Sequence, residues 1–231
     1  MDTLLHPIIT LLFTGLSWFH GLTSDWGIAI ILLTLLVRAL LFPLNLRIAR
    51  QQFRQAKMQP ILTEIRLSFA KDQTKLLQET SKVYKQFGVK PLSMIAVSLV
   101  QAPLFLSLYR VFTTHGTTMT SHFVPWIATL GQSDPMHIVP LAYAAVTFIS
   151  MVVPLTNEIA ATGSILSRVS VPALIVLVMA VIIWSSPVAI GLYWTTNSLF
   201  AIGERIWYRT PLGKKWIIHG SVALNGSYDY K

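Results

Sequence analysis

The sequence predicts an all-α membrane protein in which five transmembrane helices surround a hydrophilic groove, with an N-terminal interfacial helix and a cytoplasmic helical hairpin. Of its 231 residues, 53% are hydrophobic and only 12% are charged, too few charges to wet the surface of a soluble domain of this length. Four apolar stretches approach or exceed the roughly 20 helical residues that cross a hydrocarbon core of about 30 Å. The basic residues gather in one polar insert, whereas a nucleic-acid-binding domain spreads them along an exposed face.

The N-terminal segment, residues 1–26, is expected to form an amphipathic helix in the membrane interface. Trp18, His20 and Trp26 suit the headgroup layer, where amphipathic aromatic side chains gather. A sixth span over Thr3–Thr23 remains open. No Lys or Arg precedes the apolar run, so a signal peptide is not expected.

Five spanning helices are expected from the apolar runs that follow. The last two come from one long run, which we divide at Pro187 because proline removes an amide donor and a helical hairpin satisfies the backbone of both halves. The expected spans are 27–46, 91–112, 137–155, 169–184 and 188–206.

The distribution of Lys and Arg predicts which loops face the cytoplasm. Insert 47–90 holds ten of the 18 Lys and Arg residues and three acidic residues, so it is expected inside. Loop 113–136 has no Lys or Arg and is expected outside, whereas loop 156–168 and the tail 207–225 are expected inside. Five spans then place the N-terminus outside and the C-terminus in the cytoplasm. Residues 226–231 resemble the start of an epitope tag and do not bear on the fold.

Insert 47–90 predicts two amphipathic helices that pair as a hairpin. Apolar residues recur at helical spacing on each side of a turn near Lys71 and Asp72, and two such neighbours bury their apolar faces on each other. Pro60 is expected to kink the first helix or to begin its second half. The apolar positions are Ala49, Phe53, Ala56, Ile61 and Ile65, then Leu76, Val83, Tyr84 and Phe87.

Arg38 lies well inside the first expected span, with Thr34 one turn earlier. An arginine inside a spanning helix costs roughly 2.5–3.5 kcal/mol on insertion scales, so it should face protein or water. Two interpretations remain open: the long side chain reaches the headgroups, or it faces a water-filled recess. The other spans carry no acidic residue at comparable depth, so we expect no buried ion pair and favour a recess open to the cytoplasm.

Polar side chains of other spans are candidates for lining the same recess. Gln101 and Asn197 each need several hydrogen-bond partners, so a wet cavity explains them at least as well as contacts between helices do. Ser98 and the threonines beside Trp194 fit the simpler interpretation, interhelical hydrogen bonds. The predicted groove residues are Arg38, Thr34, Gln101, Ser98, Trp194 and Asn197.

Catalytic and metal-binding patterns are absent from the sequence. It contains no G-x-S-x-G, H-E-x-x-H or P-loop motif and no paired carboxylates within a span. There is no cysteine, and no two of the six histidines have ligand spacing on one helix. We therefore expect no enzyme activity, no cofactor and no metal site.

Five segments between residues 24 and 210 share their order and spacing with one known family. They are Val37–Leu44, Met58–Ile65 with Tyr84–Leu92, Gln101–Tyr109, Trp126–Pro135 and Ser186–Asn197. Together they resemble the YidC/Oxa1/Alb3 family of membrane protein insertases. The chain departs from the family pattern at Lys90, where many members have Asn, and in its short tail. With no large outer domain before the core, the short form of the family is expected.

The resemblance implies a five-helix core whose hydrophilic groove opens to the cytoplasm and to lipid but is closed on the outer side. It implies that Arg38 attracts the acidic or polar part of an incoming client. It also implies that the hairpin, about Leu46–Gly88, captures clients or contacts partners. The hairpin residues expected to do so are Arg54, Met58, Pro60 and Tyr84.

The function implied by the resemblance is that of an insertase and chaperone in the bacterial inner membrane, acting without nucleotide hydrolysis. Its expected partners are nascent membrane protein clients and phospholipids, with the Sec translocon, the ribosome and the signal recognition pathway as further candidates. No nucleic acid is expected except through the ribosome. The alternatives are a lipid scramblase and a small-solute transporter, although a transporter would usually show paired repeats, and none is visible.

Overall fold

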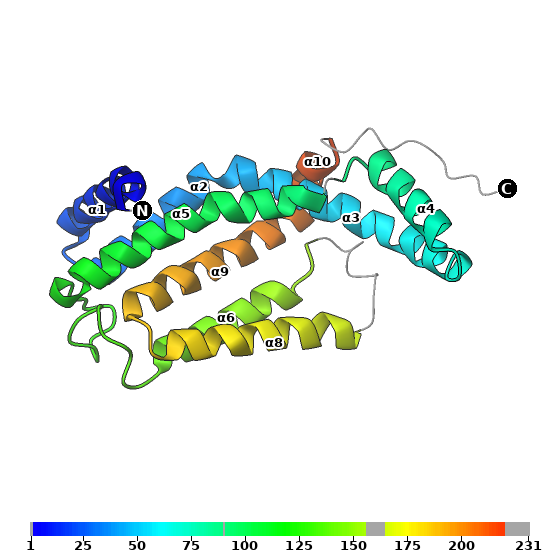
Figure 1. Cartoon of the computed structure of the whole chain (residues 1–231). Helices are drawn as coiled ribbons and strands as arrows, with labels where there is room; N and C mark the ends of the chain where they lie inside the picture. The colour runs from blue at the N-terminus through cyan, green and yellow to red at the C-terminus, as the bar shows by residue number, and fades with distance from the viewer. Residues whose placement is uncertain (1, 90, 156–164, 220–231) are drawn as a thin grey trace. The chain divides into compact units, whose positions relative to one another are not determined.

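The structure, a computed structural model, describes the backbone of residues 2–89, 91–155 and 165–219 and the side chains of 5–89, 101–155 and 169–218. Every regular element in these ranges is helical, so the all-α class is confirmed (Figure 1). The elements are α1 Asp2–Thr23, α2 Trp26–Leu40, α3 Phe42–Ser68, α4 Gln73–Gln86, α5 Pro91–His115, the 3-10 turn η1 Gly116–Thr118, α6 Ile138–Val152, α8 Ile165–Trp184, α9 Val188–Arg209 and α10 Pro211–His219. Residues 226–231 lie outside the described residues, and so does most of loop 156–168.

The chain divides into two compact units, which we describe separately. Unit 1 comprises Met1–Leu41, Ser98–Val153 and Ile165–Gly203. Unit 2 comprises Phe42–Val97, Pro154–Ser164 and Glu204–Lys231.

The described helices differ in how well they suit a membrane span. By length and composition, α1 over Leu5–Thr23 is able to cross a membrane, and α2 with α3 adds a second span if the pair is one broken helix. Two further helices, α6 and the Val169–Trp184 part of α8, are apolar but shorter. The count of five spans and the interfacial placement of residues 1–26 therefore stay predictions.

The first expected span, 27–46, is interrupted at Leu41. Asp25 caps the start of α2, and Leu41 caps its end with an N–H that bonds to the Val37 carbonyl. The next helix begins at Phe42, so Pro43 falls in its first turn. Proline is tolerated there because the first amides of a helix have no intrahelical acceptor, whereas inside a continuous helix it would remove a hydrogen bond. The break is therefore a local consequence of Pro43.

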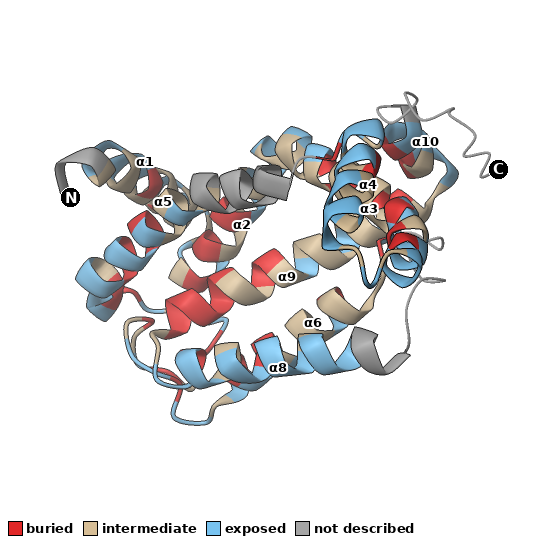
Figure 2. Cartoon of the chain, turned by 45° about the vertical axis from the view of Figure 1, so that its right-hand side comes forward, coloured by how far each residue is buried: buried red, intermediate tan, exposed pale blue. Residues whose placement is uncertain are grey.

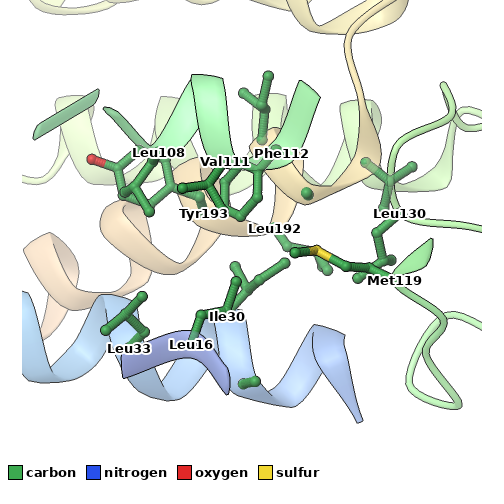
Figure 3. Packing of buried hydrophobic residues seen from close by; sticks show 14 of the residues in the cluster. Leu16, Ile30, Leu33, Leu108, Val111, Phe112, Met119, Leu130, Leu192 and Tyr193 are labelled. Atoms are coloured by element: carbon green, nitrogen blue, oxygen red, sulfur yellow. The ribbon is translucent and has the colours of Figure 1, made fainter. Parts of the chain in front are cut away.

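The core of unit 1 joins side chains from α1, α2, α5 and α9 with the loop after η1 (Figure 3). Its labelled members are Leu16, Ile30, Leu33, Leu108, Val111, Phe112, Met119, Leu130, Leu192 and Tyr193. In α1, α2 and α5 the core residues recur at helical spacing, so each of these helices buries one face. Helix α9 begins with six consecutive buried residues, 188–193, and is buried on all sides there.

Helix α8 lies beside α6 and leaves most of its surface exposed (Figures 1 and 2). Most of the exposed side chains in its described part, residues 169–184, are aliphatic. They include Val171, Leu174, Leu177, Val178 and Val181, all 48% exposed or more. A contiguous apolar surface of this kind is unfavourable in water and suits contact with lipid.

Two buried carboxylates fasten the loop between η1 and α6. Asp25 accepts hydrogen bonds from Ser121 Oγ at 2.6 Å and from the amides of His122 at 2.5 Å and Phe123 at 3.1 Å. Asp134 accepts from Trp126 Nε1 at 3.1 Å and from the amides of Met136 at 2.9 Å and Val139 at 2.8 Å. Both carboxylates thus bond to donors that would otherwise lack partners in an irregular segment.

Gly116 of η1 and Gly131 of the loop that follows bring backbone against backbone. The amide of Gly131 donates to the Gly116 carbonyl at 2.9 Å. A Cβ on Gly116 would lie 2.7 Å from Gly131 Cα, and a Cβ on Gly131 would lie 2.7 Å from the Gly116 carbonyl carbon. Neither position accepts a larger residue without moving the backbone.

Unit 2 contains the helical hairpin. Helix α3 runs through Pro60, and Asp72 caps the start of α4, where its carboxylate accepts from the Lys75 amide at 3.0 Å. The two helices, together with Val89 after α4, bury a shared cluster of Met58, Leu62, Ile65, Val83 and Val89.

The C-terminal helix α10 packs on α3 in the same unit. Ile217 is fully buried, in a cluster with Leu46, Ala49 and Phe53 of α3. Arg50 Nε donates to the Trp216 carbonyl at 3.0 Å. These contacts fix which face of α10 points inward.

Candidate functional site

A cavity of about 230 Å³ lies within unit 1 and contains the arginine singled out in the sequence. Helices α2, α5, α6, α8 and α9 all contribute to its wall. The lining residues are Arg38, Gln101, Phe105, Tyr143, Met179, Tyr193, Trp194, Asn197 and Ser198.

Arg38 is half-buried and bonds to the amide side chain of Asn197. Its Nε donates to Asn197 Oδ1 at 2.5 Å. Asn197 is itself 8% exposed and hydrogen-bonds with Tyr193 one turn earlier on α9. The carbonyls within a helix already accept hydrogen bonds from backbone amides. A half-buried guanidinium between helices therefore finds its acceptors in side chains such as Asn197. Asn197 thus positions Arg38 at the cavity wall.

Aromatic rings form another part of the wall. Phe105 stacks on Trp194 with ring centroids 5.3 Å apart and an interplanar angle of 19°. Tyr143 approaches the same indole at 5.6 Å. Beside them the hydroxyls of Thr147 and Ser198 hydrogen-bond at 2.7 Å. The wall of the cavity therefore combines one cation and several neutral polar groups with an apolar aromatic surface. This combination suits an amphipathic ligand.

Four of the six predicted groove residues meet at this cavity: Arg38, Gln101, Trp194 and Asn197. Thr34 does not line it. Its buried hydroxyl donates to the Ile30 carbonyl of its own helix at 2.6 Å. The side chain of Ser98 lies outside the described residues. Binding of a client by these residues stays a prediction.

Sequence reasoning missed five lining residues: Phe105, Tyr143, Met179, Tyr193 and Ser198. Phe105, Tyr193 and Ser198 carry a usable signal, since they lie one helical turn from Gln101, Asn197 and Trp194, respectively. Tyr143 lies one turn before Thr147, which bonds to the lining residue Ser198, but the sequence reasoning did not assign Thr147 to the groove. Met179 lies in an apolar stretch of α8 and carries no such signal.

The hairpin residues predicted to contact clients differ in exposure. Pro60 is exposed, and Arg54 and Tyr84 are half-buried. Met58 is fully buried between α3 and α4. It supports the hairpin and would have to leave that core before it could touch a client.

A comparison with family models finds the family described as 60Kd inner membrane protein, which matches residues 18–215. Among curated proteins, the membrane protein insertase YidC of Marinobacter nauticus is 34% identical over 199 residues, covering 86% of this chain and 34% of the relative. The protein of the same name from Nitrosococcus oceani is 32% identical over 199 residues, covering 86% of this chain and 35% of the relative. The chain thus spans about a third of the length of these relatives.

A solved structure shares the fold. The crystal structure described as active YidC insertase with the first transmembrane domain resolved matches with a TM-score of 0.64 at 22% identity. The match covers 90% of this chain and 46% of the other. At this identity the likeness bears on the fold alone.

Proposed function

The chain belongs to the 60Kd inner membrane protein family, and from this membership we propose that it is a membrane protein insertase that uses the Arg38 cavity. The resemblance noted in the sequence is confirmed by the family match and by relatives named membrane protein insertase YidC. Their names favour an insertase over a scramblase or a transporter. The activity needs no catalytic group.

The observation that carries the proposal is the position of Arg38 beside Asn197 on the wall of a 230 Å³ cavity. An acidic or polar segment of a client would enter there and meet a positive charge away from bulk water. At an effective dielectric constant of 20, two unit charges about 4 Å apart attract by about 4 kcal/mol. That attraction would offset part of the cost of moving the segment out of water.

Release into lipid would complete the reaction. The client's apolar helix gains free energy when its surface leaves water, which drives the step without nucleotide. The exposed aliphatic surface of α8 suits a lipid-facing flank of the route. We place the N-terminus outside, the C-terminus in the cytoplasm and the groove open to the cytoplasm and to lipid.

The proposed partners are nascent membrane proteins and the surrounding phospholipids. The Sec translocon, the ribosome and the signal recognition pathway remain candidates through the hairpin. Pro60, Arg54 and Tyr84 reach its surface to different degrees and are its proposed contact residues.

The test compares Arg38→Ala with Arg38→Lys in vesicles that contain the purified protein and a single-span client with an acidic N-terminal tail. We expect Arg38→Ala to insert this client roughly tenfold less, and Arg38→Lys to retain most activity, because the charge is kept. Lys75→Ala is the matched control, since it removes a cation whose side chain is 65% exposed on the hairpin.

Insertion by Arg38→Ala at the wild-type level would show that the charge has no role. A labelled phospholipid in the same vesicles separates an insertase from a scramblase. A scramblase would equilibrate the label between leaflets in the absence of any client.

A further inference from the structure

Helix α10 carries an exposed face that combines apolar and basic side chains. Leu212 is 66%, Trp216 51% and Ile218 44% exposed. Lys215 is exposed between them, and Lys214 is half-buried. The opposite face, with Gly213 and Ile217, is buried.

The orientation of α10 is fixed by contacts within unit 2. Thr210 Oγ1 accepts the Gly213 amide at 3.1 Å and caps the helix. A Cβ on Gly213 would lie 2.1 Å from the Trp207 carbonyl oxygen, so only glycine allows this close turn after α9. Together with the bond from Arg50 to the Trp216 carbonyl, these contacts keep the apolar and basic face outward.

The charged residues around α10 are mostly basic. Residues 204–219 hold the cations Arg205, Arg209, Lys214 and Lys215 and a single acid, Glu204. Glu204 accepts a hydrogen bond from Asn45 Nδ2 at 3.1 Å, and Arg209 donates to the Pro154 carbonyl at 2.7 Å. The two lysines of α10 are the cations nearest in sequence to its exposed leucine and tryptophan.

We infer that α10 is an interfacial helix that docks on anionic phospholipid headgroups. A short helix with Leu and Trp on its outer face and Lys beside them matches the composition of segments that lie in the headgroup layer. Only residues 207–210 separate it from the expected span 188–206, so the helix is tethered within reach of that layer. The lysines pair with phosphates while Leu212 and Trp216 enter the acyl boundary.

Lipid explains this face better than nucleic acid does. Binding to RNA would use the lysines but would leave Leu212, Trp216 and Ile218 in water. A lipid surface serves both kinds of side chain. The inference rests on the proposed membrane location but not on the insertase mechanism.

The absence of cysteine from the chain allows a direct test. Leu212→Cys, labelled with an environment-sensitive fluorophore, is reconstituted as the full chain in vesicles of phosphatidylcholine, alone or mixed with phosphatidylglycerol. We expect a blue-shifted emission that brominated lipids quench, and a larger shift with phosphatidylglycerol. The matched control is Leu67→Cys, an exposed leucine (77%) beside Arg66 on the hairpin, which should report water in both.

Charge variants test the choice of lipid. Lys214→Gln and Lys215→Gln should each weaken the phosphatidylglycerol-dependent docking about fivefold, and added salt should do the same. Aqueous emission at position 212 in anionic vesicles would overturn the proposal. Docking that is unchanged in both lysine variants would also overturn it. So would shielding of the probe that appears only after RNA is added.

Failure of the insertase proposal would be seen separately. Client insertion by the wild-type chain is measured in vesicles of the same composition. If the client is not inserted but the probe at position 212 still reports contact with lipid, the insertase proposal fails and the inference about α10 stands.

Discussion

Acidic and basic groups of unit 1 occupy different surroundings. Asp25 and Asp134 are 3% and 2% exposed and are surrounded by amide and side-chain donors. Arg38 is half-buried and faces a cavity. A carboxylate needs only donors, which an irregular loop supplies from its own backbone, whereas a guanidinium has five donors and finds few acceptors among helices. The comparison indicates that the two carboxylates stabilise the fold, whereas binding of a client by Arg38 stays a prediction.

The largest expected effect is on stability, from Asp134→Ala. The substitution leaves Trp126 Nε1 and the amides of Met136 and Val139 without their acceptor, and each buried donor so stranded costs about 1–3 kcal/mol. We expect a loss of about 4 kcal/mol in denaturant unfolding of the detergent-solubilised protein. Asp72→Ala, which removes an exposed helix cap, should cost only about 1 kcal/mol. Equal losses would contradict a special role for Asp134.

The second prediction concerns η1 and the loop after it, which Asp25 and Asp134 stabilise. Gly116→Ala should destabilise by about 2 kcal/mol, because the new Cβ meets backbone that has to move. Gly21→Ala on α1 is the control, since nothing lies within 4 Å of its Cβ. That variant should gain about 0.5 kcal/mol, because glycine is unfavourable in a helix. A tolerated Gly116→Ala would show that the loop is looser than its hydrogen bonds indicate.

The lowered pKa of Asp25 predicts that the free energy of unfolding depends on pH. Burial raises the pKa of Asp25, but hydrogen bonds from Ser121 and from the amides of Ile28, His122 and Phe123 lower it, and the pKa ends below its ordinary value of 3.8. The unfolded chain therefore binds this proton more readily, so the stability contributed by Asp25 is complete above pH 3.8 and is lost as the pH falls through the folded pKa.

The measurement is thermal unfolding of wild type and Asp25→Asn between pH 7 and pH 3. We expect Asp25→Asn to be less stable at pH 7, because its amide group faces N–H donors, and to lose less on acidification. Parallel curves for the two proteins would exclude Asp25 as a source of acid sensitivity.

The smallest expected effect on stability comes from Arg38→Gln. The hydrogen bond to Asn197 is lost, but so is the cost of holding a charge away from water, and these nearly cancel. We expect a change below about 1 kcal/mol alongside the loss of insertion proposed for Arg38→Ala. A loss as large as that of Asp134→Ala would make Arg38 a structural residue and end the contrast.

The sequence by itself determined the all-α class, the paired helices on either side of Asp72 and the polar groups that accompany Arg38. These follow from local properties: hydrophobic content, helical spacing, and the rarity of a charge in an apolar run. Only the tertiary structure decided that Thr34 bonds to its own helix, that Tyr143 and Met179 join the cavity, and that Asp25 and Asp134 fasten a loop. Those outcomes depend on which faces of distant segments meet, and spacing within one segment carries no information about its neighbour.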